Sequence, residues 1–252
     1  MSLATLLRKI IPESARPIKY LMNQAWSGTQ GKVRAGPFQG MVYGEHSFGS
    51  CYIPKVLGIY EHECYPAVEW ASAQKPAIIV DVGAAEGYYA IGLCLRNPQA
   101  RVIAFEMEET GRKLLSEGVA RNGCRDRLEI RGACEPAGLT EALGDASPAL
   151  VVCDCEGYEN VVLDPEAVPA LRRAMILVEL HDVFQPGTRE RIKSRFETTH
   201  EVEEIISRPH DASEYPYSSM YTRLLPRRYL EWAVSEWRPG VMSWLWMRPR
   251  PK

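Results

Sequence analysis

The chain has 252 residues, enough for one sizeable hydrophobic core with a small appended unit. Hydrophobic residues make up 46% and charged residues 25%, as in an ordinary globular protein, and a net charge of −2 gives no global electrostatic reason to expect a nucleic acid partner. The seven cysteines form an odd set without regular spacing, which favours a reducing, cytoplasmic location over a disulfide framework. Cys153 and Cys155 lack C-x-x-C zinc spacing and are interpreted as core thiols.

The first segment, "MSLATLLRKIIPESARP", is too interrupted by charge and proline for a signal peptide. Its apolar residues fall at helical spacing, which predicts a short helix docked on the domain or on a second subunit. A membrane-surface helix is the alternative. No apolar run is long enough to span a bilayer.

The rest of the first 70 residues reads as an extension that covers a site. "GPFQGMVYGEHSFGS" predicts a hairpin with glycine-containing turns. "GIYEHECYPAVEWA" predicts a helix, although Pro66 weakens that interpretation.

From residue 71 onward we expect a ligand-binding domain of the α/β class. Continuous apolar runs predict strands at 77–82, 101–106, 127–131, 149–154 and 174–181, and helical segments are expected between them near 87–97, 108–121, 138–144 and 157–173. This alternation is typical of a parallel sheet with helices on both faces.

The last part changes in composition. Residues 207–240 are rich in Pro, Ser, Tyr and Arg, and we expect them to form an insert on the acceptor side of the site. The aromatic run "VMSWLWMRP" predicts a closing edge strand, and the tryptophans here are expected in the core or at a subunit interface.

Acidic residues follow nearly every predicted strand. In open α/β sheets, ligands bind at the carboxyl ends of the strands, so these side chains should gather on one rim. The acids concerned are Asp81, Glu106, Asp154, Glu156, Glu179 and Asp182, and His181 lies among them at the end of the fifth strand.

The loop after the first strand, Gly83-Ala84-Ala85-Glu86-Gly87, resembles a nucleotide-binding turn, but its negative charge is unsuitable for binding phosphate. It lacks G-x-G-x-x-G spacing and a Walker A lysine, and Glu86 would repel a pyrophosphate. A cationic adenosine ligand without phosphate, S-adenosylmethionine (SAM), fits better, because glycines allow close approach. Glu106 then suits the ribose hydroxyls, or alternatively caps the following helix.

Several motifs together resemble one family. "VDVGAAEGYYAIGL" with "VIAFEM" is similar to the first motifs of class I SAM-dependent methyltransferases, and "VCDCEGYENVVL" with "ILVELHD" resembles the FkbM-type subgroup. The resemblance covers about residues 55–185. It implies a Rossmann-like, seven-stranded sheet of order 3-2-1-4-5-7-6, with an antiparallel strand 7 paired to "HEVEEII". It also implies methyl transfer to an oxygen of a sugar, polyketide or other small metabolite.

The expected site has two parts. For the cofactor we expect contacts from Asp81, Gly83, Glu86, Gly87, Glu106, Met107, Ala133, Asp154, Tyr60 and Glu61. For catalysis, His181 is the leading general base, with Asp154 and Glu156 as candidates, because an alcohol acceptor must lose its proton. A structural role for His181 stays open.

Two alternatives also remain. Asp154, Glu156, His181 and Asp182 could hold Mg²⁺ or another divalent ion that lowers the pKa of the acceptor hydroxyl. The chain could instead be an NAD(P)-dependent oxidoreductase or a non-catalytic SAM-binding protein. A homo-oligomer is expected to form, if it forms, through the N-terminal helix or the C-terminal aromatic segment.

Overall fold

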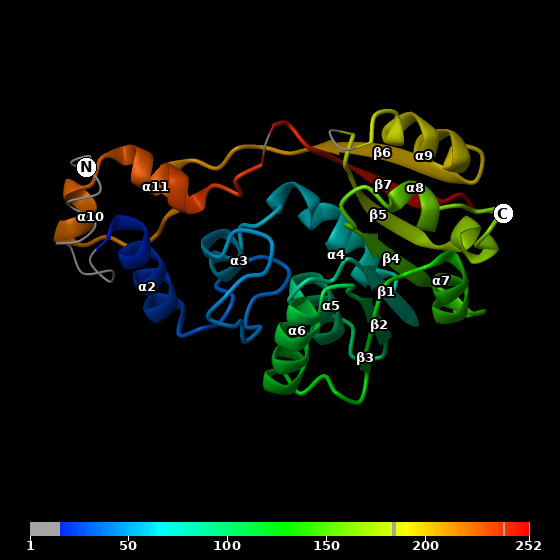
Figure 1. The fold of residues 1–252 in the computed structure, drawn as a ribbon, viewed down its shortest axis with the longest axis horizontal. Helices are drawn as coiled ribbons and strands as arrows, with labels where there is room; N and C mark the ends of the chain where they lie inside the picture. Colours follow the sequence, from blue (N-terminus) through cyan, green and yellow to red (C-terminus); the bar gives the residue numbers. More distant parts are fainter. Residues whose placement is uncertain (1–15, 183–184, 239, 252) are drawn as a thin grey trace. The chain divides into compact units, whose positions relative to one another are not determined.

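The computed structural model describes residues 16–182, 185–238 and 240–251 (Figure 1). The chain divides into two compact units. The accessory unit comprises Met1–Tyr60 and Pro209–Pro239, and the sheet unit comprises Glu61–Arg208 and Gly240–Lys252. The division thus falls at residues 60/61 and not at residue 70, because the segment after Tyr60 packs with the sheet unit. The N-terminal helix expected from residues 3–11 lies outside the described residues.

The sheet unit contains seven strands in the order β3-β2-β1-β4-β5-β7-β6, as predicted. The first five are parallel, and β7 is antiparallel to both of its neighbours. Their bounds are β1 Ile78–Val82, β2 Arg101–Phe105, β3 Leu128–Arg131, β4 Ala149–Cys153, β5 Met175–Leu180, β6 His200–Ile206 and β7 Ser243–Pro249. All residues of β1, β4 and β5 are buried, which explains their continuous apolar sequences.

The aromatic run forms β7, but it is not the edge strand predicted for it. β7 lies between β5 and β6, where Trp244 and Trp246 are buried. Both indoles therefore lie in the core of the sheet unit. The edge is β6, whose residues are exposed or half-buried except His200. Its acids Glu201, Glu203 and Glu204 remain in solvent there, as charged residues commonly do on edge strands.

Helices cover both faces of the sheet. Those of the sheet unit are η2 His62–Cys64, α4 Tyr65–Ala73, α5 Tyr88–Arg96, α6 Glu109–Arg121, α7 Pro136–Leu143, α8 Glu159–Val162, η3 Pro169–Arg173 and α9 Thr188–Phe196. A core of buried residues joins Leu139 of α7 and Phe196 of α9 to one face of the central strands. Each fully buried aliphatic or aromatic side chain contributes about 1.5–3 kcal/mol.

The helix expected over 157–173 is wrong. The segment folds as two short pieces, α8 and η3, with an irregular stretch between them. Pro165 and Pro169 explain the break, because proline lacks an N–H donor and disfavours helical conformation in the residue before it.

The accessory unit is built from short helices: α2 Pro17–Thr29, α3 Ile53–Leu57, η4 Ala212–Glu214, α10 Met220–Leu224 and α11 Arg227–Val234. The hairpin expected from residues 36–50 is reduced to one antiparallel bridge between Lys32 and Val42. Glycines at 36, 40 and 49 take positive φ angles, which turn the chain where strands would have to continue.

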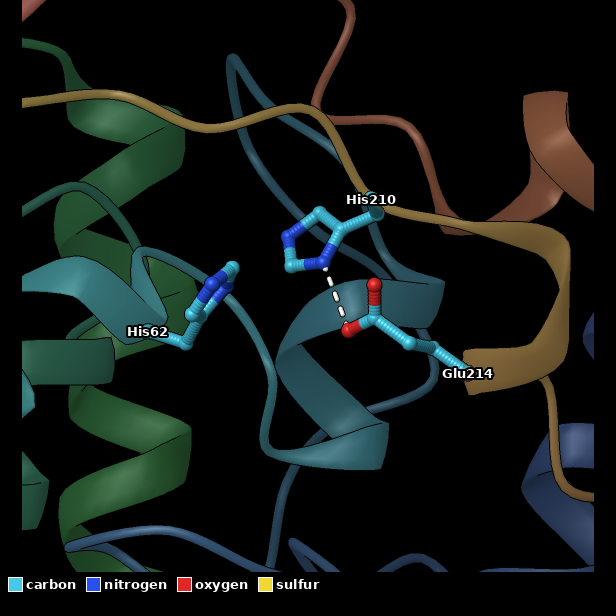
Figure 2. A group of neighbouring side chains, drawn as sticks. All are labelled: His62, His210 and Glu214. Carbon is cyan, nitrogen blue, oxygen red and sulfur yellow. Dashed lines mark hydrogen bonds and ion pairs between the residues drawn. The ribbon is translucent and has the colours of Figure 1, made fainter.

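A buried histidine ties two segments of the accessory unit together. His210 Nδ1 is hydrogen-bonded to Glu214 Oε2 (Figure 2), with 2.9 Å between the two atoms, and His210 Nε2 lies 2.8 Å from Glu236 Oε1. Arg238 also donates to Glu236 at 2.7 Å. These contacts hold η4 against the segment that follows α11.

Within the described part of the chain, no helix is both long enough and apolar enough to cross a bilayer.

Candidate active site

The backbone conformation and close packing of the loop after β1 require glycine at positions 83 and 87. Gly83 has a φ of 86°, and a Cβ there would lie 1.7 Å from the carbonyl oxygen of Asp154, at the end of β4. Gly87 has a φ of 95° and begins α5, where a Cβ would lie 2.3 Å from the side chain of Leu115. The loop therefore holds the ends of β1 and β4 close together, in addition to any approach of a ligand.

Glu106 braces this loop from the end of β2. Its Oε2 accepts a hydrogen bond from the Ala85 N–H, and its Oε1 accepts one from the Glu108 N–H, each at 2.7 Å. Glu108 is the N-cap residue of α6, so part of the helix-capping alternative is present in the structure. An ionised carboxylate can accept about four hydrogen bonds, so Glu106 retains capacity for hydroxyl donors.

Two further carboxylates lie at this end of the sheet. Asp81 of β1 is 2% exposed and Glu86 is 5% exposed. Beside Glu106, the side chain of Met107 is exposed after β2, and Ala133 is exposed after β3. We call these five residues the acidic cradle. It combines buried negative charge with small apolar surface, which is unfavourable for a phosphate.

The two expected residues upstream of the sheet, Tyr60 and Glu61, fall on either side of the boundary between the two units. Glu61 belongs to the sheet unit, is fully buried and accepts a 2.6 Å hydrogen bond from Tyr89 Oη of α5. Tyr60 belongs to the accessory unit, where its ring lies 4.9 Å from Lys55 Nζ. Their roles toward a cofactor stay predictions.

The ends of β4 and β5 bring a histidine and several acids together. His181 Nε2 lies 3.5 Å from Asp154 Oδ1, 3.6 Å from Glu156 Oε2 and 3.8 Å from Glu179 Oε2. His181 and Glu179 are buried, whereas the Glu156 side chain is mostly exposed. We call these four residues, with Glu159, the His181 cluster. Adjacent parallel strands explain why residues 154 and 181 meet.

Glu159 is the site residue that sequence reasoning missed. It is fully buried, and its Oε1 accepts hydrogen bonds from His181 Nδ1 at 2.8 Å and from the Gly157 N–H at 3.0 Å. The signal available was its position three residues after Glu156, at the start of a short helix. A buried acid on Nδ1 fixes the ring so that Nε2 is directed at Asp154 and Glu156.

The charges shift the ionisation of this cluster. Burial by itself would lower the pKa of His181, but the hydrogen bond with Glu159 and the charges of Asp154 and Glu156 outweigh it and raise that pKa. Although the Glu156 side chain is mostly exposed, partial desolvation of its carboxyl group and the charge of Asp154 raise its pKa. Burial by itself would raise the pKa of Glu159, but the bonds from His181 and the Gly157 N–H lower it.

Asp182 makes its contacts with Arg189 and not with the His181 cluster. Its Oδ1 accepts a 3.3 Å bond from the Arg189 N–H, and its Oδ2 lies 3.9 Å from Arg189 Nε. Of the four residues considered for a metal, three place their ligand atoms within 4.8 Å of one another: Asp154, Glu156 and His181.

A cavity of about 780 Å³ lies in the sheet unit between α4 and the β6–β7 hairpin. Its walls include Trp70, Glu203, Trp246 and Arg248. Residues directly opposite in antiparallel strands share a face, so the register places Glu179, Trp244 and Ile205 on one face of the sheet. Trp246 follows two residues after Trp244 and shares that face, so the cavity and Glu179 lie on the same side.

Comparison with known proteins gives partial similarities. No family model matches the chain. A curated relative, the tRNA1(Val) (adenine(37)-N6)-methyltransferase of Bacteroides thetaiotaomicron, is 37% identical over 62 residues. That match covers 24% of this chain and about a quarter (26%) of the relative's length.

Three solved structures are similar to the chain over parts of their length. An O-methyltransferase from Bacillus cereus in complex with SAH has a TM-score of 0.47 and 10% identity, covering 97% of this chain and 96% of its own. The precorrin-6y C5,15-methyltransferase of Geobacter metallireducens gives 0.44 and 14%, covering 57% and 76%. The M1A22 tRNA methyltransferase of B. subtilis gives 0.42 and 12%, covering 72% and 64%. At these identities and TM-scores, the structures support no conclusion about the substrate of this chain.

Proposed function

We propose that the chain is a SAM-dependent methyltransferase of the FkbM type, which methylates an oxygen of a sugar, polyketide or other small metabolite. The observation that carries this proposal is the pairing of two sites on one rim of a 3-2-1-4-5-7-6 sheet. The acidic cradle ends β1 and β2, and the His181 cluster ends β4 and β5. Ligands of open α/β sheets bind at this rim.

The acidic cradle suits a cationic adenosine ligand. Asp81 and Glu86 supply negative charge for an ammonium or sulfonium group, and Glu106 can accept hydrogen bonds from ribose hydroxyls. Met107 and Ala133 offer apolar surface for a base. SAM, when bound, supplies a methyl group on a sulfonium centre. The same carboxylates oppose the pyrophosphate of NAD(P), which disfavours the oxidoreductase alternative.

The His181 cluster suits removal of a proton from an alcohol. Nδ1 donates to Glu159, so Nε2 is the nitrogen that can accept a proton. Glu159, Asp154 and Glu156 then stabilise the positive ring, as the raised pKa of His181 indicates. A base whose pKa lies near the working pH is the most effective. The rest of the task is to align the acceptor and exclude water.

The cavity beside the β6–β7 hairpin supports a small-molecule acceptor. Its volume of about 780 Å³ lies in the range of metabolite sites, and it shares a sheet face with Glu179. The exposed indole of Trp70 and the guanidinium of Arg248 offer stacking surface and hydrogen-bond donors. Because one partial relative is a tRNA methyltransferase, a screen for the acceptor should include tRNA.

Calorimetry with SAM and with NADH tests the proposal. We expect saturable binding of SAM, no binding of NADH, and at least a tenfold loss of SAM affinity in Glu106→Gln, about 1.4 kcal/mol. Glu117→Gln, an exposed acid on α6, is the control and should bind SAM as the wild type does.

The outcome that overturns the proposal is NADH binding without SAM binding, or equal SAM affinity in Glu106→Gln and the wild type. A labelled-methyl screen over metabolite extracts and tRNA then identifies the acceptor. Transfer to no acceptor despite tight SAM binding would favour a non-catalytic SAM-binding protein.

A further inference from the structure

We propose that Asp154, Glu156 and His181 form a binding site for a divalent first-row metal ion, which holds the oxygen of the methyl acceptor. This inference rests on the proposed function, since it places the ion where the acceptor is expected.

The ligand atoms are close enough to share one ion. Each of the three residues offers one ligand atom within 4.8 Å of the other two, and His181 Nε2 is 3.5 Å from Asp154 Oδ1 and 3.6 Å from Glu156 Oε2. A metal with bonds of about 2.0–2.2 Å to nitrogen and oxygen holds neighbouring ligand atoms about 2.8–3.6 Å apart. The Nε2 distances already fall in this range.

The histidine distinguishes this group from an ordinary cluster of surface acids. His181 is 3% exposed, and Glu159 fixes its Nδ1 from a fully buried position, with the Gly157 N–H holding Glu159 in turn. In metal-binding histidines, the N–H of the ring nitrogen that does not bind the metal characteristically donates a hydrogen bond to such a carboxylate, and this bond orients the ring. The ring thereby directs Nε2 toward Asp154 and Glu156.

The charge around the ring also favours a cation. Asp154, Glu156, Glu159 and Glu179 place four carboxylates around one imidazole, which carries at most one positive charge. Each ionised carboxylate repels the others in this partly buried place. A doubly charged ion between Asp154, Glu156 and His181 offsets that repulsion.

The donor set indicates the kind of ion. Carboxylate oxygen suits Mg²⁺ and Mn²⁺, whereas imidazole suits first-row transition metals. Two carboxylates with one imidazole therefore favour Mn²⁺ or Zn²⁺ over Mg²⁺. Three protein ligands leave positions for water and an acceptor hydroxyl, whose pKa a bound ion lowers. Nε2 would then be a ligand, and the ion would replace it as the activating group.

The 252-residue protein, freed of metal with a chelator, would be titrated with Mn²⁺ while free Mn²⁺ is followed by electron paramagnetic resonance. We expect one saturable site that Zn²⁺ displaces. Asp154→Asn and His181→Asn should each weaken Mn²⁺ binding about 10–100-fold or more. Asp182→Asn changes an acid at the same rim that contacts Arg189, and it should bind Mn²⁺ as the wild type does. Circular dichroism checks that each variant is folded.

The inference is overturned if neither Mn²⁺ nor Zn²⁺ binds saturably at millimolar concentration. It is also overturned if folded Asp154→Asn and His181→Asn proteins bind Mn²⁺ as tightly as the wild type, because the ion then lies elsewhere. SAM calorimetry on the same samples separates the two proposals. Intact SAM binding without a metal site removes this inference alone, whereas absent SAM binding removes the proposed function.

Discussion

Gly83 occupies a point where two strand ends nearly touch. Besides the contact between a Cβ and the Asp154 carbonyl oxygen, the N–H groups of Gly83 and Ala84 both donate to the Phe105 carbonyl at 2.9 Å. The backbone is therefore held from β2 and β4 at once and cannot move away from an added side chain. Its positive φ disfavours any other residue as well.

Gly83→Ala should accordingly lower the free energy of unfolding by about 3 kcal/mol, the combined effect of overlap and backbone strain. Urea unfolding followed by fluorescence measures it. Gly132→Ala is the matched control, because it lies at the end of β3 on the same rim with nothing within 4 Å of its Cβ. Equal losses in the two variants would show that the contact with Asp154 does not matter.

The sequence after β4 does not reveal which of its acids, Glu156 or Glu159, is buried. Both acids follow β4 within six residues, yet Glu159 is fully buried under His181 whereas Glu156 is mostly exposed, with a φ of 54°. The turn at Gly157 contributes to this difference, because the Gly157 N–H donates to Glu159 Oε1 and holds that carboxylate under His181. The sequence indicated an acid-rich rim, but the supporting role of Glu159 required the three-dimensional turn.

Among the elements, the link between η4 and the segment after α11 depends on one ionisable ring. Burial by itself would lower the pKa of His210, but the hydrogen bonds with Glu236 and Glu214 outweigh burial and raise that pKa. A histidine whose pKa is raised on folding stabilises the fold below its unfolded pKa, near 6.5, and the contribution disappears as pH rises through the folded value.

Glu236→Gln should thus destabilise the protein by about 2 kcal/mol at pH 6, where the wild-type pair is charged. The difference from the wild type should shrink as pH rises toward 9. Urea unfolding at both pH values measures this, with Trp232 and Trp237 of the accessory unit as fluorescent reporters. Glu231→Gln, which removes an exposed pair with Arg227, should cost little at either pH. A loss that is the same at pH 6 and pH 9 would contradict the role assigned to His210.

At the scale of the whole molecule, the sheet was predictable and the accessory unit was not. Buried parallel strands are continuous apolar runs, so β1 to β5 follow from the sequence, and resemblance supplied their order. The composition of the aromatic run suggested an edge strand, whereas the strand order implied by the resemblance places it between β5 and β6, as the structure does. In the accessory unit, residues 209–239 join residues 1–60 across more than 140 positions, and short helices do not reveal such distant pairing.

Binding of SAM should protect a defined part of the sheet unit from hydrogen exchange. The N–H groups of Gly83, Ala84, Ala85 and Glu108 are bonded to Phe105 and Glu106, so their exchange requires the cradle to open. A ligand that binds only the closed cradle opposes opening by about 2.7 kcal/mol at one hundred times its dissociation constant, which slows exchange about a hundredfold.

Exchange measured by mass spectrometry should therefore slow in peptides covering 81–87 and 105–108 when SAM is added. A peptide over α7 serves as the internal reference, because α7 packs on the face of β1 that carries Ile78 and Val80, and Asp81 lies on the opposite face. NADH at the same concentration should change none of these peptides. Protection confined to other strands would place the ligand away from Asp81 and Glu106, and the acidic cradle would then have to be explained as a purely structural brace between β1, β2 and β4.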